Sequence, residues 1–148
     1  MRDDIWLNQR LDQIWLLLFP ELAKLNKVKA RFKGHWKNKF GHIKLVKNKD
    51  TEIAINSIFK DQRVPEYIID ITLAHELVHY MHGFNSPHQR KYRHPHKGGI
   101  VDKELINRGF GHLIVKEKRF CKEDWTKIYP EYCKPRIRRL TLKSFFRF

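Results

Sequence analysis

The sequence has few acidic residues, little cysteine and no long hydrophobic run. Only 16 Asp and Glu accompany 31 Lys and Arg among 148 residues, which leaves a net charge of +15. Two cysteines are too few for a disulfide framework or a four-Cys zinc ribbon. The apolar run at 14–19 is far shorter than the roughly 20 residues that cross a bilayer. We therefore expect no signal peptide, no membrane contact and no secretion, and a cytoplasmic, nucleoid-associated or nuclear location.

The apolar content is sufficient for one folded domain. Hydrophobic residues make up 41% of the chain and aromatic residues 13%, so the chain can bury a core and is not a disordered basic tail. The large excess of positive charge predicts a polyanionic partner, and nucleic acid is the first candidate.

The positive charge is concentrated in two blocks. Residues 24–49 hold ten basic residues and no acidic one, and residues 116–148 hold eleven basic and four acidic residues. Basic side chains follow phosphates and aromatic rings stack on unpaired bases, so we expect single-stranded or junction DNA as the partner. Alternatively, the aromatic residues of the first block point into the core, and the second block is an edge strand. The candidate DNA-binding residues are Lys29, Arg31, Lys33, Trp36, Lys37, Lys39, Arg136, Arg138 and Arg139.

The hydrophobic pattern predicts an α+β fold. Apolar residues three and four apart predict an N-terminal helix that breaks at Phe19, because Pro20 follows. Alternating segments then predict a small three-stranded sheet, and two further helices flank a His-rich loop. The expected elements are a helix from 4 to about 25, strands at 28–32, 42–46 and 52–56, a helix from 65 or 66 to 81 or 82, a loop at 84–99 and a helix at 100–108.

The second predicted helix contains an H-E-x-x-H motif at residues 75–79. Residues four apart share one helix face, so His75 and His79 can reach the same zinc ion. Glu76 can reach a water on that ion without binding the metal, which is the position of a general base. The motif predicts a zinc-dependent hydrolase with Glu76 as its catalytic residue.

A catalytic zinc site needs a third protein ligand and one open position. The candidates are His96 and His94 in the predicted loop, and Glu104 on the helix that follows it. Glu104 would correspond to the arrangement of gluzincin peptidases. The donor for a tetrahedral oxyanion is equally open, and Tyr80, Tyr92, His88 and His94 are the side chains considered.

At these residues the chain resembles the SprT-like domain, the zinc metalloprotease family of bacterial SprT and of Spartan, a protease for DNA–protein crosslinks. The resemblance covers residues 11 to about 109 and rests on Trp15, Phe19-Pro20, the segment 52–56 and the sequence from Leu73 to His79. It implies a zincin-like fold, and it implies a histidine as third ligand. His96 gives the best register for it, although Lys97 and Ile100 replace the Gly and Phe of the family's pattern.

The resemblance also implies that the protein cleaves proteins attached to DNA. We expect residues 1–115 to form the metalloprotease domain, residues 116–148 to form a basic extension, and the chain to act as a monomer. Two other functions stay open at this point. One is a gluzincin-like cytosolic zinc peptidase that is independent of DNA, and the other is a non-catalytic nucleic-acid-binding module with a structural zinc.

Overall fold

The structure is a computed structural model that describes residues 1–133, so the predicted DNA-binding residues Arg136, Arg138 and Arg139 lie outside the described residues. The fold is α+β, as predicted. Its elements in chain order are α1 (Asp4–Leu18), β1 (Val28–Lys33), β2 (Gly41–Leu45), β3 (Thr51–Asn56), α2 (Glu66–Met81), α3 (Ile100–Asn107), α4 (Gly111–Phe120) and α5 (Thr126–Ile128).

The three strands form a mixed sheet in the order β1-β3-β2. β3 is parallel to β1 and antiparallel to β2. Because β2 is the last strand in this order, it is an edge strand. Because side chains alternate between the two faces of a strand, one face carries the apolar residues and packs under the helices. These buried residues are Ala30, Phe32, Ile43, Ile53 and Ile55.

The first helix ends at Leu18, next to the predicted break at Phe19, and its predicted extent to about residue 25 is wrong because residues 19–25 are not helical. Asp3 caps its N-terminus by accepting a hydrogen bond from the Trp6 backbone, and the helix stops at Leu18, two residues before Pro20. Arg10 ties this helix to α2 through a bidentate contact with Asp70, with N–O distances of 2.5 and 2.6 Å. Such paired charged hydrogen bonds fix the orientation of two helices as well as their distance.

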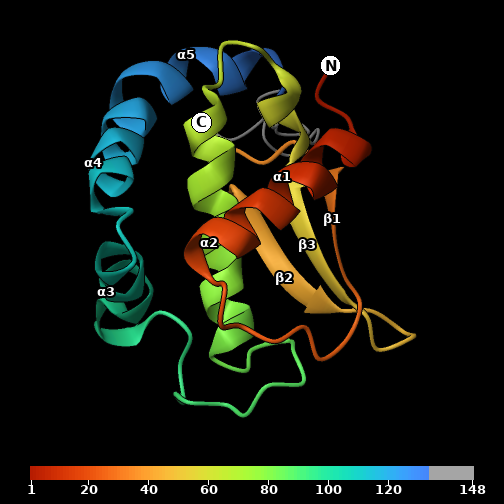
Figure 1. Ribbon diagram of the computed structural model, residues 1–148. Helices are drawn as coiled ribbons and strands as arrows, with labels where there is room; N and C mark the ends of the chain where they lie inside the picture. Colours follow the sequence, from red (N-terminus) through yellow and green to blue (C-terminus); the bar gives the residue numbers. More distant parts are fainter. Residues whose placement is uncertain (134–148) are drawn as a thin grey trace, which may run out of the picture.

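Helix α2 lies at the centre of the molecule, between the sheet and the α3–α4 pair (Figure 1). It starts after Pro65 and is buried over nearly its whole length. It ends at Met81, and Gly83 adopts a positive φ of 83° that turns the chain away. A helix buried on all sides holds its polar side chains in fixed positions, which suits the H-E-x-x-H motif.

The C-terminal part of the described chain is helical beyond residue 115. Helix α4 runs through residue 115, and the chain continues in helical turns to residue 131. Phe120, Trp125 and Ile128 are buried in the same core as the sheet and α2. Part of the segment 116–133 therefore packs on the same core as the sheet and α2.

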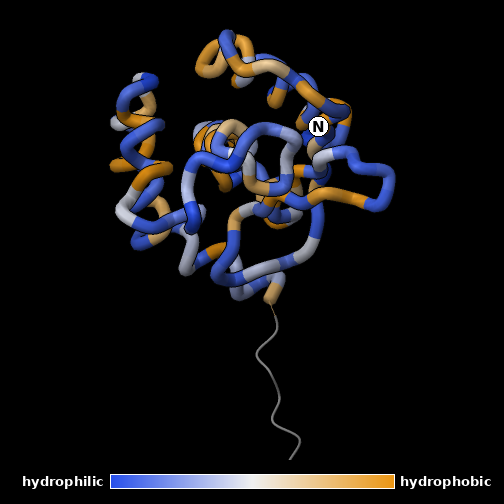
Figure 2. The backbone as a smooth tube through the Cα atoms, turned by 90° about the horizontal axis from the view of Figure 1, so that it is seen from below, coloured by the Kyte–Doolittle hydropathy of each residue, from blue (hydrophilic) through white to orange (hydrophobic). Residues whose placement is uncertain are grey.

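The loop between α2 and α3 crosses one end of the molecule. Seen from that end, hydrophilic segments pass in front of the hydrophobic ones (Figure 2). Within residues 1–133, no helix combines the length and the apolar character that a membrane crossing requires.

Candidate metal centre and its cleft

Three histidine rings meet at one side of α2. The Nε2 atoms of His75 and His79 are 3.1 Å apart, and the Nε2 atom of His96 lies 3.3 Å from the first and 2.9 Å from the second. Two nitrogens bound to one tetrahedral ion at about 2.0–2.1 Å are separated by about 3.3–3.4 Å, so the three rings fit a single ion. This cluster could hold a metal ion.

Burial keeps the helical histidines in the neutral form that binds metal. Loss of water contact, together with the neighbouring ring of His96, lowers the pKa of His75 to about 4. Burial and the charges of the other two rings lower the pKa of His79 to about 3. Both imidazoles therefore offer a free lone pair at neutral pH.

His96 reaches the cluster because the loop that carries it is fixed at its start. Ser86 donates to the Tyr80 carbonyl at 2.6 Å, and His88 donates to the Ala23 carbonyl at 2.7 Å. The Lys91 backbone donates to the His82 carbonyl at 3.0 Å. These contacts turn the loop back over the end of α2, and His96 itself remains exposed.

Glu76 points to the same side of α2 and is 4% exposed. Burial raises its pKa to about 8, with the charge of Lys39 acting in the opposite direction. No described residue forms a hydrogen bond or an ion pair with its carboxylate. Its carboxyl group therefore has no partner among the described residues and faces the cleft.

Two hollows adjoin at the cluster and form one cleft. The first, of about 250 Å³, is lined by the three histidines together with residues of β2 and the loop after α2. The second, of about 300 Å³, is lined by Asn38, Lys39, Phe40, Gly41, Thr72, His75, Glu76 and Glu117. Gly41, His75 and Glu76 line both hollows, so the candidate site opens in two directions.

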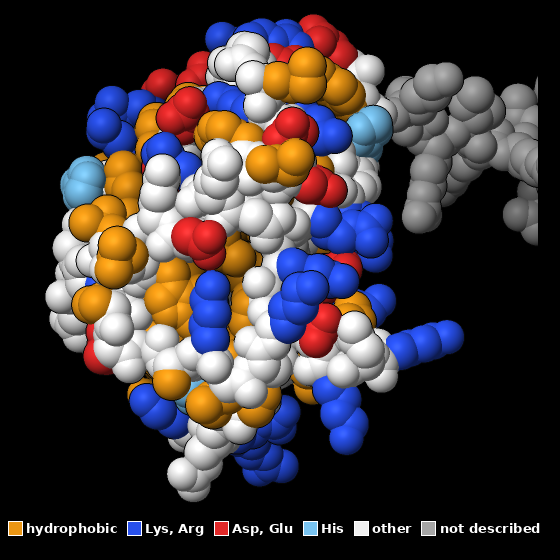
Figure 3. Space-filling model, turned by 45° about the vertical axis from the view of Figure 1, so that its right-hand side comes forward, with side chains coloured by type: hydrophobic (Ala, Val, Ile, Leu, Met, Phe, Trp, Pro, Cys, Tyr) orange, Lys and Arg blue, Asp and Glu red, His pale blue; other side chains and the backbone are white. Residues whose placement is uncertain are grey.

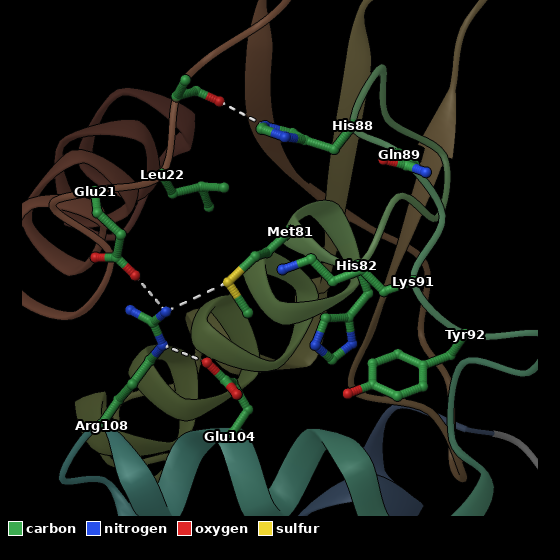
Figure 4. A pocket seen from close by; sticks show the side chains of 11 residues that line it. Glu21, Leu22, Met81, His82, His88, Gln89, Lys91, Tyr92, Glu104 and Arg108 are labelled. Atoms are coloured by element: carbon green, nitrogen blue, oxygen red, sulfur yellow. Dashed lines mark hydrogen bonds and ion pairs between the residues drawn. The ribbon is translucent and has the colours of Figure 1, made fainter.

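Glu104, the rival third ligand, lies away from the cluster. Its carboxylate accepts a hydrogen bond from Arg108 Nε at 2.9 Å, and Arg108 also pairs with Glu21. Glu104 and Arg108 line a separate cavity beyond His82, where their side chains point toward Glu21 (Figure 4). Glu104 is thus engaged elsewhere and does not complete a ligand set with His75 and His79.

His94 also lies outside the cluster and lines a shallow surface hollow with Tyr92. The oxyanion donors considered from the sequence also lie outside the cleft. Tyr80 donates to Asn26 at 2.8 Å in the interior, and His88 is bonded to Ala23. Tyr92 packs over His82 in the separate cavity. None of these side chains lines the cleft, whose N–H donors among the described residues include Asn38 and Lys39.

The basic residues of the first block lie in two places. Lys29, Arg31 and Lys33 alternate along β1 on the sheet face that the helices leave open, and Arg31 pairs with the buried Glu52 at 3.7 Å. The space-filling view shows Lys and Arg side chains gathered toward the right of the picture (Figure 3). Lys37 and Lys39 lie in the loop between β1 and β2 and are exposed.

The aromatic residues of this block favour the alternative interpretation. Trp36 packs against His42 with ring centroids 5.3 Å apart, and the Lys39 ammonium lies 4.2 Å from the centre of the indole ring. Phe32 is buried, and Phe40 packs edge-on against Phe59. These rings serve the fold, which leaves an electrostatic role for the basic residues.

Glu117 is the functional candidate that the sequence reasoning missed. It lies on α4 and lines the second hollow together with Glu76. A signal existed, because Leu113, Ile114, Glu117 and Phe120 recur at a spacing of three and four residues. A charged residue at a core-facing position of an amphipathic helix is unusual.

Comparison with protein-family models, with curated proteins and with solved structures gives no match to this chain. The case for a function therefore depends on the geometry of the site and on the sequence resemblance.

Proposed function

We propose that this protein is a zinc-dependent metalloendopeptidase of the SprT-like type that cleaves proteins bound or crosslinked to DNA. The observation that carries the proposal is the arrangement of three imidazole Nε2 atoms within 3.3 Å of one another beside a buried, unpaired glutamate in an open cleft. A structural zinc site is closed and has no use for such a carboxylate, which argues against a non-catalytic module.

His75, His79 and His96 would hold the ion through three ligands and leave one position open to the cleft. When bound there, a zinc ion would supply Lewis-acid chemistry: it would lower the pKa of a water in the open position toward about 7 and would polarise the carbonyl of the scissile bond. Glu76 takes the proton from the attacking water and delivers it to the leaving amine. The burial of Glu76 keeps bulk water from competing for that proton.

The free edge of β2 provides a place for the substrate backbone. Phe40 accepts a hydrogen bond from Asn56 of β3, so alternate residues, including Gly41 and Ile43, direct their backbone groups to the open edge. Asn85 occupies only the Ile43 carbonyl, at 3.0 Å. An extended peptide that pairs with this edge would pass directly over the metal cluster, because β2 lines the first hollow.

DNA is the partner that the charge supports. Lys29, Arg31 and Lys33 present one row of positive charge on the open sheet face, and Lys37 and Lys39 continue it beside the cleft. Phosphates held along this row would bring proteins on the same DNA close to the metal centre. A cytoplasmic, nucleoid or nuclear location follows from this partner.

Glu76→Gln separates metal binding from catalysis. The variant keeps all three histidines, so we expect it to bind one zinc ion per chain and to lose cleavage of a casein substrate by at least about 100-fold. His96→Ala removes one ligand and should reduce zinc affinity by about tenfold or more, whereas His94→Ala, two residues away, should leave it unchanged. Elemental analysis and substrate cleavage measure both effects.

Two results would overturn the proposal. One is full cleavage by zinc-loaded Glu76→Gln, because it would remove the general base from the mechanism. The other is equal zinc content in His96→Ala and the wild type, because it would show that the histidine cluster is not the metal site.

A further inference from the structure

The second hollow of the cleft contains a carboxylate that the proposed mechanism does not use. Glu117 reaches it from α4, which packs beside α2 (Figure 1). The hollow adjoins Glu76 and His75, so any side chain that entered it would belong to a substrate residue next to the scissile bond. Phe40 and Thr72 line the same hollow.

Glu117 has no counter-ion among the described residues, although basic residues are abundant in the chain. It is half-buried, and it forms no ion pair or hydrogen bond through its carboxylate within residues 1–133. Lys39 lines the same hollow, but its ammonium group lies over the Trp36 ring, 4.2 Å from the ring centre. Burial, with the charge of Asp102, raises the pKa of Glu117 to about 7.

A carboxylate that is partly removed from water without a partner destabilises the free protein, and a bound cation reverses that cost. A lysine or arginine side chain matches the hollow chemically. Its methylene stem can lie along Phe40 and Thr72 while its charged end reaches Glu117. Proteins that bind DNA are rich in these two residues, because they neutralise phosphates.

We propose that Glu117 forms the charged end of a specificity subsite that receives a lysine or arginine side chain beside the scissile bond. This inference rests on the proposed protease function and adds to it the class of substrate residue that the cleft selects. It makes Glu117 a determinant of specificity and assigns it no part in proton transfer.

The test uses peptide pairs that differ at one residue. A peptide with lysine beside the cleaved bond is compared with one that has norleucine there, which keeps the stem and removes the charge. The comparison is made on each side of the bond, with full-length zinc-loaded protein at pH 8. We expect the wild type to favour lysine on one side by about tenfold in kcat/KM, the effect of one charged hydrogen bond.

Glu117→Gln should reduce this ratio to near one, and Glu117→Lys should reverse it in favour of a glutamate peptide. Glu123→Gln is the matched control, because Glu123 is exposed and does not line the hollow. A merely structural role would change kcat/KM for all peptides together and would not change the ratio. The ratio is measured within one variant, so each variant is tested independently. If Glu117→Lys does not fold, Glu117→Gln decides the test.

A wrong subsite and a wrong protease function would give different results. If the wild type cleaves the lysine and norleucine peptides equally on both sides, or if Glu117→Gln keeps the preference, the subsite is overturned and the protease function stands. If the zinc-loaded wild type cleaves no peptide, the proposed function itself is overturned.

Discussion

Two carboxylates of this chain differ in what surrounds them. Asp61 accepts hydrogen bonds from Arg63 and from Tyr132, whose hydroxyl lies 2.6 Å away. The Arg63 guanidinium, more than the tyrosine, holds the pKa of Asp61 well below its usual range. Glu117 has neither kind of partner, and its pKa is raised. The first carboxylate stabilises the fold, whereas the second is available for a ligand.

Tyr132→Phe should lower the free energy of unfolding by about 1–2 kcal/mol at pH 7, because it removes one hydrogen bond to a charged acceptor. Asp61 has a lowered pKa in the folded state, so its stabilising contacts are present above its unfolded pKa of about 3.9 and are lost as the pH falls below it. Urea unfolding should therefore show the difference at pH 7, and the stability of the wild type should itself decline as the pH falls below about 4.

The control for this prediction is Tyr92→Phe, because Tyr92 is 44% exposed and lies in the loop after α2. It should change stability by less than about 0.5 kcal/mol. A loss of stability in Tyr132→Phe no larger than that in Tyr92→Phe would show that the contact with Asp61 does not stabilise the fold.

Among the elements, α4 and the turns after it build one wall of the cleft. Trp125 donates from its indole nitrogen to the Lys37 carbonyl at 2.8 Å, and its ring packs against Phe40 with centroids 5.1 Å apart. Phe40 in turn lines the hollow that contains Glu117. The segment after residue 115 thus positions the loop between β1 and β2 at the candidate site.

Trp125→Ala should lower the free energy of unfolding by about 3–5 kcal/mol, because it leaves a large cavity in a packed aromatic cluster. A chain that ends at residue 115 should fail to fold, whereas a chain that ends at residue 133 should give a cooperative thermal transition. Circular dichroism measures both. A stable, cooperative 1–115 fragment would support the predicted domain boundary at residue 115.

Much of this architecture is predictable from the sequence because its signals are local. Alternation in short segments predicts the strands to within one or two residues, and Pro20 and Gly83 predict two helix ends. The spacing of His75 and His79 predicts that their rings lie close together, because a helix places residues four apart on the same face.

Features that depend on distant contacts were not predictable. Whether His96 or Glu104 joins the pair depends on how the loop after α2 folds back and on Arg108, which holds Glu104. The basic composition after residue 115 suggested an extension, and it concealed the spacing of the buried residues on α4. Composition describes the solvent-facing side of an amphipathic helix, whereas the periodic positions decide whether it packs.

On the scale of the whole molecule, positive charge and the metal cluster occupy different surfaces. The row formed by Lys29, Arg31 and Lys33 lies on the open sheet face, and the cleft lies where β2 meets α2. In the proposed function, this separation would allow DNA and a protein chain to bind at the same time. We therefore expect DNA binding to depend on charge at the sheet face and not on the metal.

The triple variant with alanine at positions 29, 31 and 33 should bind single-stranded DNA more weakly. The magnitude of the slope of log K against log salt should fall by about 2–3, because the loss of three phosphate contacts reduces the number of counterions that binding releases. Fluorescence anisotropy at several salt concentrations measures the slope, and zinc content should stay at the wild-type value. An unchanged slope would remove the sheet face from the DNA site.

In the function proposed above, the histidine cluster and Glu76 hydrolyse peptide bonds, and isotope incorporation tests this directly. Zinc-loaded protein is incubated with casein in water enriched in oxygen-18, and the new peptide ends are analysed by mass spectrometry. We expect new carboxyl ends that carry one oxygen-18 atom, and none after chelation of the metal or with Glu76→Gln. If the zinc-loaded wild type produces no new ends, the histidine cluster is not a peptidase centre.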